Sequence, residues 1–155
     1  KLAGMEMQVL AYDKYKTNYT DAYPHVEETD LETILMHSDI ISFHLPLTKE
    51  THHYADASFF TKCRKNVILI NTSRGQVIET SLLVNELLSG KVRGACLDVF
   101  ENEKPQTFTA LENEYYEQLY QLPQVVLTPH IAGWTVESKE RLASILLQKI
   151  LTTKS

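Results

Sequence analysis

The chain has 155 residues, of which 43% are hydrophobic and 23% charged, and its net charge is −5. This is the composition of an ordinary globular domain with its own core. An acidic chain without a basic cluster is not expected to bind nucleic acid, and no apolar run approaches the roughly 20 residues of a membrane span. Cys63 and Cys96 lack CxxC spacing and no signal-peptide pattern opens the chain, so we expect a cytoplasmic protein.

The first residues already suggest alternating helix and strand. Residues 1–4 resemble the end of a helix with a glycine stop, and the apolar run 7–12 predicts a strand that Asp13 closes. Residues 14–25 are polar and rich in tyrosine. They are expected to form a surface loop.

A helix pattern follows, with Thr29 or Asp30 as its N-cap. Residues 40–44 then predict a strand, which Pro46 stops because proline cannot donate to a strand ladder. A short helix is expected over 57–62.

The central strand is expected over 67–71, where four large aliphatic residues in a row predict burial on both faces. Such strands belong to parallel sheets, in which ligands bind beyond the carboxyl ends of the strands, and Arg74 lies in the short polar turn after this one. A helix over 79–88 with a left-handed stop at Gly90, and a strand over 94–99, come next.

The last third contains a polar excursion over 101–124 with a helix within 111–121, and then a short strand over 125–127. Thr135 can cap a final amphipathic helix whose apolar stripe extends to Ile150. Strands and helices alternating in this way predict an α/β fold with a doubly wound parallel sheet.

Ionisable groups follow three of the predicted strands. They are Arg74, the carboxylates of Asp98, Glu101 and Glu103, and His130. Because the carboxyl ends of parallel strands meet at one edge, we expect these groups to converge. A guanidinium binds a carboxylate through two hydrogen bonds, and histidine transfers protons near neutral pH. The set is suited to interconverting a hydroxyl and a carbonyl beside a carboxylate.

Four ordered segments resemble the D-isomer-specific 2-hydroxyacid dehydrogenases, the family that includes D-lactate, D-glycerate, formate and D-3-phosphoglycerate dehydrogenases. The segments are DIISFHLPLT (39–48), INTSRG (70–75), GACLDVFENE (94–103) and TPHIAG (128–133). The resemblance implies a Rossmann-like NAD-binding domain and an NAD-dependent oxidoreductase.

The resemblance also implies catalytic roles. Arg74 is similar to the arginine that binds the substrate carboxylate, His130 to the acid/base, and Glu103 to the glutamate that orients and charges the histidine. One residue separates Glu103 from the proline that usually follows this glutamate in the family. Glu101 therefore stays an alternative to Glu103.

The family's cofactor-binding positions fall after the strand ends. They are Asp13, Leu45, Pro46, Thr51, Thr72, Ser73, Arg74, Asp98, His130 and Gly133. Asp98 resembles the residue that holds the nicotinamide carboxamide. Asp13 also follows from first principles, because an acid at this strand end accepts hydrogen bonds from the ribose hydroxyls and repels a 2′-phosphate. We therefore expect NAD rather than NADP as the cofactor, although Lys14 beside Asp13 slightly weakens this preference.

The five glycines do not form the G-x-G-x-x-G turn that approaches a pyrophosphate. That turn and the first strand would precede Lys1, which leaves a gap of about 10 Å at the sheet centre. We expect residues 1–151 to be part of an NAD-binding domain and 152–155 a tail, with the substrate domain outside this chain. Alone, the chain should bind NAD poorly.

The expected function is NAD-dependent oxidation of a small D-2-hydroxy acid, or reduction of the 2-keto acid, by the intact protein. An alternative is an NADH-sensing, co-repressor-like interaction protein on the same fold. Family members are commonly homodimers, and we expect one here. His52 and His53 are adjacent without a further ligand pattern, so no metal site is expected.

Overall fold

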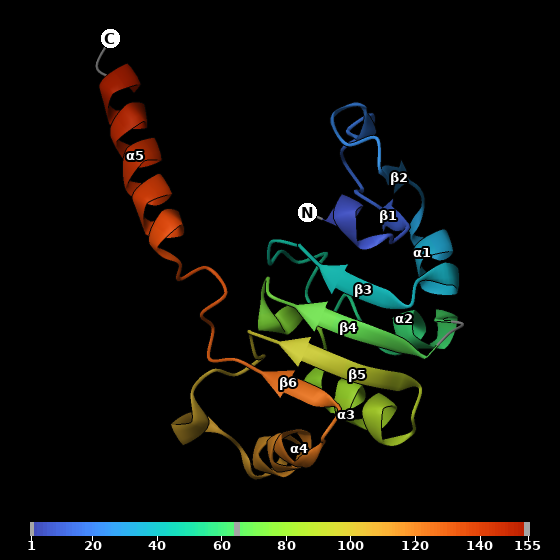
Figure 1. The fold of residues 1–155 in the computed structure, drawn as a ribbon. Helices are drawn as coiled ribbons and strands as arrows, with labels where there is room; N and C mark the ends of the chain where they lie inside the picture. Colours follow the sequence, from blue (N-terminus) through green and yellow to red (C-terminus); the bar gives the residue numbers. More distant parts are fainter. Residues whose placement is uncertain (1, 64–65, 154–155) are drawn as a thin grey trace.

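A computed structural model describes residues 2–63 and 66–153 and has the alternating α/β arrangement expected from the sequence (Figure 1). The strands are β1 (Val9–Ala11), β2 (Val26–Glu28), β3 (Ile40–Phe43), β4 (Val67–Asn71), β5 (Val92–Leu97) and β6 (Val125–Leu127). The α-helices are α1 (Leu31–His37), α2 (Ala57–Lys62), α3 (Thr80–Leu88), α4 (Ala110–Gln121) and α5 (Val136–Thr153). Short 3-10 helices span Leu2–Met5, Thr20–Ala22, Gly75–Val77 and Pro105–Thr107. None of the helices in the described ranges has the length and apolar character needed to cross a bilayer.

Every strand pair is parallel, but the strands form two separate sheets. The larger sheet has the order β3-β4-β5-β6, and β1 pairs only with β2, with Val9 opposite Val26. Within the described residues no strand joins β1 to β3. This is the break expected for a 3-2-1-4-5-6 order from which the central strand is missing.

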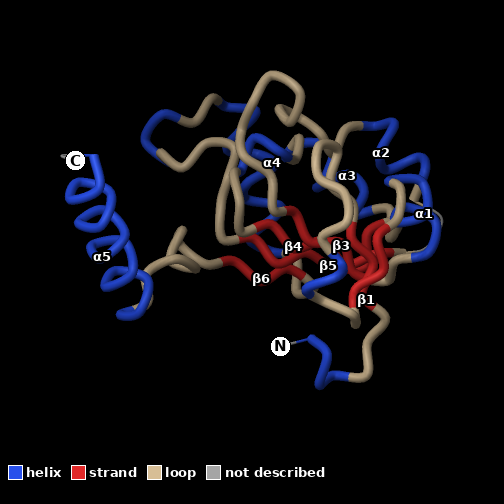
Figure 2. The backbone as a smooth tube through the Cα atoms, turned by 90° about the horizontal axis from the view of Figure 1, so that it is seen from above, coloured by secondary structure: helices blue, strands red, loops and turns tan. Residues whose placement is uncertain are grey.

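Helices α2, α3 and α4 lie on one side of the larger sheet (Figure 2). Burial therefore alternates along the strands, because successive side chains point to opposite faces. In β4, Val67 and Leu69 are fully buried, whereas Ile68 is only partly buried and its register partner Ile40 on β3 is exposed. The expected burial of β4 is complete on the helix-covered face and partial on the other.

Several elements have the bounds predicted from the sequence. The structure confirms α2, β4 and β6 residue for residue, and it selects Asp30 as the N-cap of α1 because its carboxylate accepts from the Thr33 N–H at 2.7 Å. β5 begins two residues before its predicted start. β2 is not among the predicted strands, because Val26 is the one apolar residue in its three positions.

The glycine stop expected at Gly4 is wrong. Gly4 lies inside the 3-10 helix Leu2–Met5, and the left-handed residue is Glu6, with φ 52°. Lys1 lies outside the described residues. The stop expected after α3 is confirmed, because Gly90 has φ 78°.

Helix α5 stands apart from the rest of the molecule (Figure 1). Thr135 caps it as predicted, accepting from the Ser138 N–H at 3.1 Å. No residue of α5 is buried, and its apolar side chains, such as Leu142 and Ile150, are exposed. The helix runs to Thr153, into the segment expected as a tail, and residues 154–155 lie outside the described part.

Candidate functional site at the carboxyl edge of the sheet

The carboxyl ends of β4, β5 and β6 meet at one edge of the larger sheet. The parallel ladder continues just past the strands, with the Asp98 N–H donating to the Asn71 carbonyl at 2.9 Å and the Thr128 N–H to the Leu97 carbonyl at 3.0 Å. Arg74, Asp98 and His130 each follow within three residues of a strand end. The sequence-predicted convergence at one edge is therefore consistent with the topology.

The turn that carries Arg74 is built by Asn71, the last residue of β4. Asn71 is 1% exposed, and its amide donates to the Arg74 carbonyl at 2.9 Å while its oxygen accepts from the Ser73 N–H and hydroxyl at 3.0 and 2.8 Å. The Arg74 guanidinium donates to the Ser73 carbonyl at 2.6 Å and forms no ion pair with any described carboxylate. Its remaining donors are left for a ligand.

Sequence analysis missed Asn71. The signal available was an amide residue at the end of a buried strand, directly before a short polar turn.

Gly75 lets this turn approach the segment after β5. A Cβ at Gly75 would lie 1.9 Å from both the carbonyl carbon and oxygen of Phe100 and 2.5 Å from the Glu101 nitrogen. Real Cβ atoms do not approach backbone this closely, so only glycine fits without a shift. The Arg74 turn and the loop that carries Glu103 are thereby held against each other.

Asp98 holds the loop that carries His130. The carboxyl group is on a residue 4% exposed. Its Oδ1 accepts from the Thr128 hydroxyl at 2.6 Å and the Ile131 N–H at 2.9 Å, and its Oδ2 from the Ala132 N–H at 2.9 Å. Burial opposes ionisation, but these hydrogen bonds outweigh it and lower the pKa of Asp98 below its ordinary value. Oδ2, with one described partner, still has a free acceptor position for a cofactor amide.

His130 occupies a left-handed backbone conformation, with φ 54°, which is uncommon outside glycine. Its Nδ1 lies 3.0 Å from Glu103 Oε2, and both side chains are nearly half exposed. An ionised carboxylate can only accept, so Nδ1 carries the proton in this contact. Nε2 has no hydrogen-bond partner among the described residues and can exchange a proton with a bound molecule.

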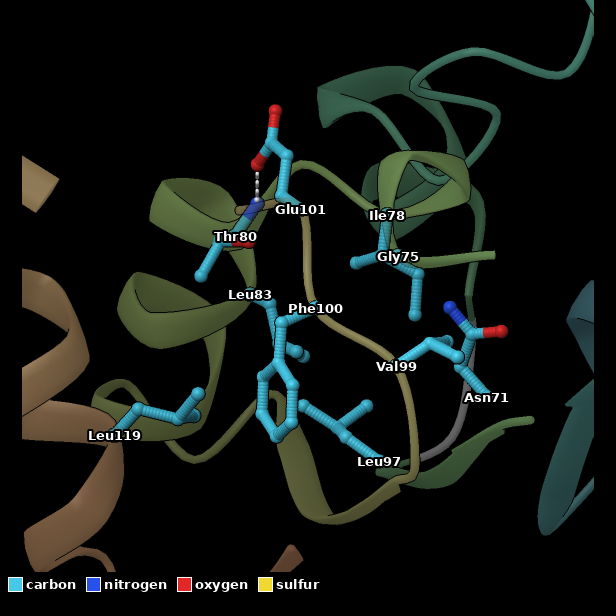
Figure 3. A pocket seen from close by; sticks show the side chains of 10 residues that line it. All are labelled: Asn71, Gly75, Ile78, Thr80, Leu83, Leu97, Val99, Phe100, Glu101 and Leu119. Atoms are coloured by element: carbon cyan, nitrogen blue, oxygen red, sulfur yellow. Dashed lines mark hydrogen bonds between the residues drawn. The ribbon is translucent and has the colours of Figure 1, made fainter. Parts of the chain in front are cut away.

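Glu101 pairs with a different histidine. Its Oε1 lies 2.5 Å from His53 Nε2, and its Oε2 accepts from the Thr80 N–H at 3.0 Å, at the start of α3 (Figure 3). The two glutamates of the ENE segment are thus assigned to two histidines, and Glu103 is the one beside His130. The cavity below Glu101 is about 10 Å³, which is room for about one water and not for a substrate.

Asp13 stands at the end of β1 in a tight turn. Its Oδ1 accepts from the backbone N–H groups of Tyr15 and Lys16 at 2.8 and 3.0 Å. These two bonds hold the pKa of Asp13 below its ordinary value. Oδ2 has no partner among the described residues, so an ionised oxygen is available to ribose hydroxyls.

The other expected cofactor positions lie on the loops of the same edge. The Thr51 hydroxyl donates to the Pro46 carbonyl at 2.5 Å, which closes the loop after β3, and Leu45 packs against the core. Thr72 is exposed directly after β4. Gly133 is exposed, with open space where a Cβ would stand. These residues fit a dinucleotide, because they offer backbone, hydroxyl and apolar surface around an acid that can take a ribose.

No group of three or more metal-binding side chains gathers anywhere in residues 2–63 or 66–153. The rings of His52 and His53 lie 4.0 Å apart. Among the described carboxylates, Glu101 lies within hydrogen-bonding distance of His53 and Glu79 lies 3.9 Å from its Nδ1.

A family model described as "D-isomer specific 2-hydroxyacid dehydrogenase, NAD binding domain" matches residues 1–132. Among curated proteins, a glyoxylate reductase of Thermofilum pendens is 38% identical over 153 residues, 97% of this chain and 42% of the relative. A hydroxypyruvate reductase of Thermotoga maritima is 41% identical over 144 residues, 93% of this chain and 44% of the relative.

Solved structures agree in fold. The NAD complex of a D-isomer-specific 2-hydroxyacid dehydrogenase from Lactobacillus delbrueckii ssp. bulgaricus aligns with a TM-score of 0.84 and 32% identity, covering 98% of this chain and 47% of that one. D-lactate dehydrogenase from Aquifex aeolicus, complexed with NAD and lactic acid, aligns with a TM-score of 0.82 and 33% identity, covering 97% and 47%. This chain thus spans less than half the length of the relatives it matches.

Proposed function

Because this chain belongs to the D-isomer-specific 2-hydroxyacid dehydrogenases, in the NAD-binding domain of that family, we propose that the full-length protein is an NAD-dependent oxidoreductase. It interconverts a small D-2-hydroxy acid and the corresponding 2-keto acid. Residues 1–151 form part of its NAD-binding domain, and its substrate domain lies outside this chain. The observation that carries the proposal is the contact of His130 Nδ1 with Glu103 Oε2 at 3.0 Å. This contact lies at the sheet edge that also carries Arg74, whose guanidinium forms no ion pair with any described carboxylate.

Each catalytic candidate has a chemical task. Arg74 binds the substrate carboxylate through paired hydrogen bonds and so orients the neighbouring C2 carbon. His130 Nε2 gives a proton to the substrate oxygen in reduction and takes it back in oxidation. Glu103 accepts the hydrogen bond from the Nδ1–H group and so orients the ring, with Nε2 left to face the substrate oxygen.

The residues that would hold NAD are those of the carboxyl edge. Asp13 would take the ribose hydroxyls, Thr72 and Ser73 line the turn after β4, and Asp98 has an acceptor position for the carboxamide. Bound NAD supplies the oxidising or reducing equivalent of the reaction. The side chains of the protein bind, orient and protonate the substrate.

The test is His130→Ala in the full-length protein, assayed for NADH-dependent reduction of a panel of small 2-keto acids. General acid catalysis contributes about 10²- to 10⁴-fold, so kcat should fall by that factor while the variant still binds NADH. His37→Ala, at the exposed end of α1, is the matched control. Full activity in His130→Ala would refute the role. No turnover by the wild type with any keto acid, together with tight NADH binding, would favour the NADH-sensing alternative.

The substrate class is supported by the names of the relatives, which act on glyoxylate, hydroxypyruvate or D-lactate. We propose a cytoplasmic location for the protein, consistent with the two free cysteines in the described residues. We also propose that it is a homodimer whose ligands are small molecules, without nucleic-acid or membrane partners. Sedimentation of the full-length protein at twice the mass of one chain would support the dimer.

A further inference from the structure

The end of β1 and the loop after β3 are joined by a charged contact, although the two strands do not pair. Lys14 Nζ lies 2.9 Å from Glu50 Oε2, and the Tyr15 hydroxyl donates to the same oxygen at 2.5 Å. Both members of the ion pair are 57% exposed. Glu50 therefore sits beside the ammonium group that follows Asp13.

Lys14 is a candidate for the cation that would bind the 2′-phosphate of NADP. An acid at the end of this strand selects a ribose 2′-hydroxyl, whereas a nearby cation accommodates a 2′-phosphate. Lys14 follows Asp13 directly, and on the sequence alone it weakens the preference for NAD. Lys16 is the residue whose positive charge acts on Asp13, and it is left unchanged in the comparison below.

The contact with Glu50 changes this balance in two ways. It directs the Lys14 ammonium group to a carboxylate instead of a phosphate, and it neutralises the charge that would attract one. The hydrogen bond and charge of Glu50 raise the pKa of Lys14, so the lysine is charged and the pair is ionic. The Tyr15 hydroxyl fixes the same carboxylate oxygen and so favours one geometry of the pair.

We propose that Glu50 is a specificity-determining residue, which holds Lys14 away from a 2′-phosphate and thereby favours NAD over NADP. The inference rests on the proposed function, because it presupposes a dinucleotide site beside Asp13. Glu50 lies on the loop after β3 and outside the four segments that resemble the family, so the resemblance gives it no role at the ribose.

The experiment measures the dissociation constants of NADH and NADPH separately, by the fluorescence of the reduced nicotinamide, on the full-length protein at low ionic strength. Glu50→Gln keeps the size of the side chain and removes its charge. Glu50 and Lys14 are both exposed, so solvent screens their charges, but a 2′-phosphate carries nearly two negative charges. NADPH affinity should therefore rise about three- to ten-fold, and NADH affinity should change less than about two-fold.

Two further variants isolate the mechanism. Glu117→Gln removes an exposed carboxylate on α4 and should leave both affinities unchanged. Lys14→Met combined with Glu50→Gln should abolish most of the gain in NADPH affinity, because Lys14 is then absent. The gain in Glu50→Gln should also shrink as salt is added, since exposed charges are screened.

An unchanged NADPH affinity in Glu50→Gln, an equal gain for both dinucleotides, or a gain that persists in full without Lys14 would each overturn the inference. With normal NADH binding by the wild type, any of these leaves the proposed function standing. A wild-type protein that binds neither dinucleotide overturns the proposed function, and the role of Glu50 falls with it.

Discussion

Replacing Asp98 by asparagine tests whether this buried carboxylate organises the His130 loop. The carboxylate accepts three hydrogen bonds from Thr128, Ile131 and Ala132. Asparagine keeps one oxygen, which can face Thr128 and Ile131, but its NH₂ group then meets the Ala132 N–H. One hydrogen bond to a charged group is lost, at about 1.5–3 kcal/mol, and the other two become neutral and weaker.

The sum is a destabilisation of about 3 kcal/mol, a large part of the 5–15 kcal/mol typical of a domain. Urea unfolding of the full-length protein at pH 7, followed by far-UV circular dichroism, measures it. Asp30→Asn is the matched control, because asparagine caps a helix as well as aspartate does, so the stability of the protein should change little. A change in Asp98→Asn as small as that of the control would show that the loop does not depend on the charge.

The effect should depend on pH with a definite sign. The pKa of Asp98 in the folded protein is below its ordinary value of 3.8, because hydrogen bonds outweigh the opposing effect of burial. A group with a depressed pKa stabilises the fold above its unfolded pKa and loses that contribution as the pH falls through the folded value. The stability difference between wild type and Asp98→Asn should therefore be constant from pH 7 to about pH 5 and shrink below about pH 4. A difference that grows on acidification would contradict this reasoning.

Two further substitutions probe the loops around the site. Gly75→Ala should destabilise the protein by about 3 kcal/mol, since its Cβ would lie 1.9 Å from the Phe100 carbonyl. Gly4→Ala, whose Cβ would meet open space, is the control in the same thermal-unfolding assay. Equal melting temperatures of the two variants would refute the close approach at Gly75. Thr109→Ala should cost about 1 kcal/mol in urea unfolding, because Thr109 forms a capping box with Glu112 at the start of α4. Thr109→Ser should retain the cap, and a loss as large as that of alanine would count against it.

The parts of the fold that were predicted well are those whose signal is local. The run 67–71 and the Asp56-capped segment 57–62 each carry their pattern within a few residues, and both have their predicted bounds in the structure. β2 has three residues and one apolar side chain, so neither alternation nor a hydrophobic run marks it. It forms because β1 offers a parallel partner, which is a non-local cause.

The site shows the same difference between local sequence signals and contacts that depend on the tertiary structure. The order of residues along the chain identified Arg74, Asp98 and His130 as the groups after successive strands, because a parallel sheet brings carboxyl ends to one edge. The family resemblance favoured Glu103 but left Glu101 as an alternative, because the two are only two residues apart in the same polar segment. Their distances to His53 and His130, 2.5 and 3.0 Å, come from contacts across 48 and 27 positions of the chain.

What the sequence by itself determined is the alternation of strands and helices, the family resemblance and the identities of the ionisable groups, since these depend on residue type and short spacing. Only the tertiary structure decided which histidine Glu101 and Glu103 each contact. It also decided that Asp98 accepts hydrogen bonds from the His130 loop and that Glu50 forms an ion pair with Lys14. The physical reason is that hydrogen bonds and ion pairs act over about 3 Å in space. Separation along the chain does not encode such distances until the strands have been packed into a sheet.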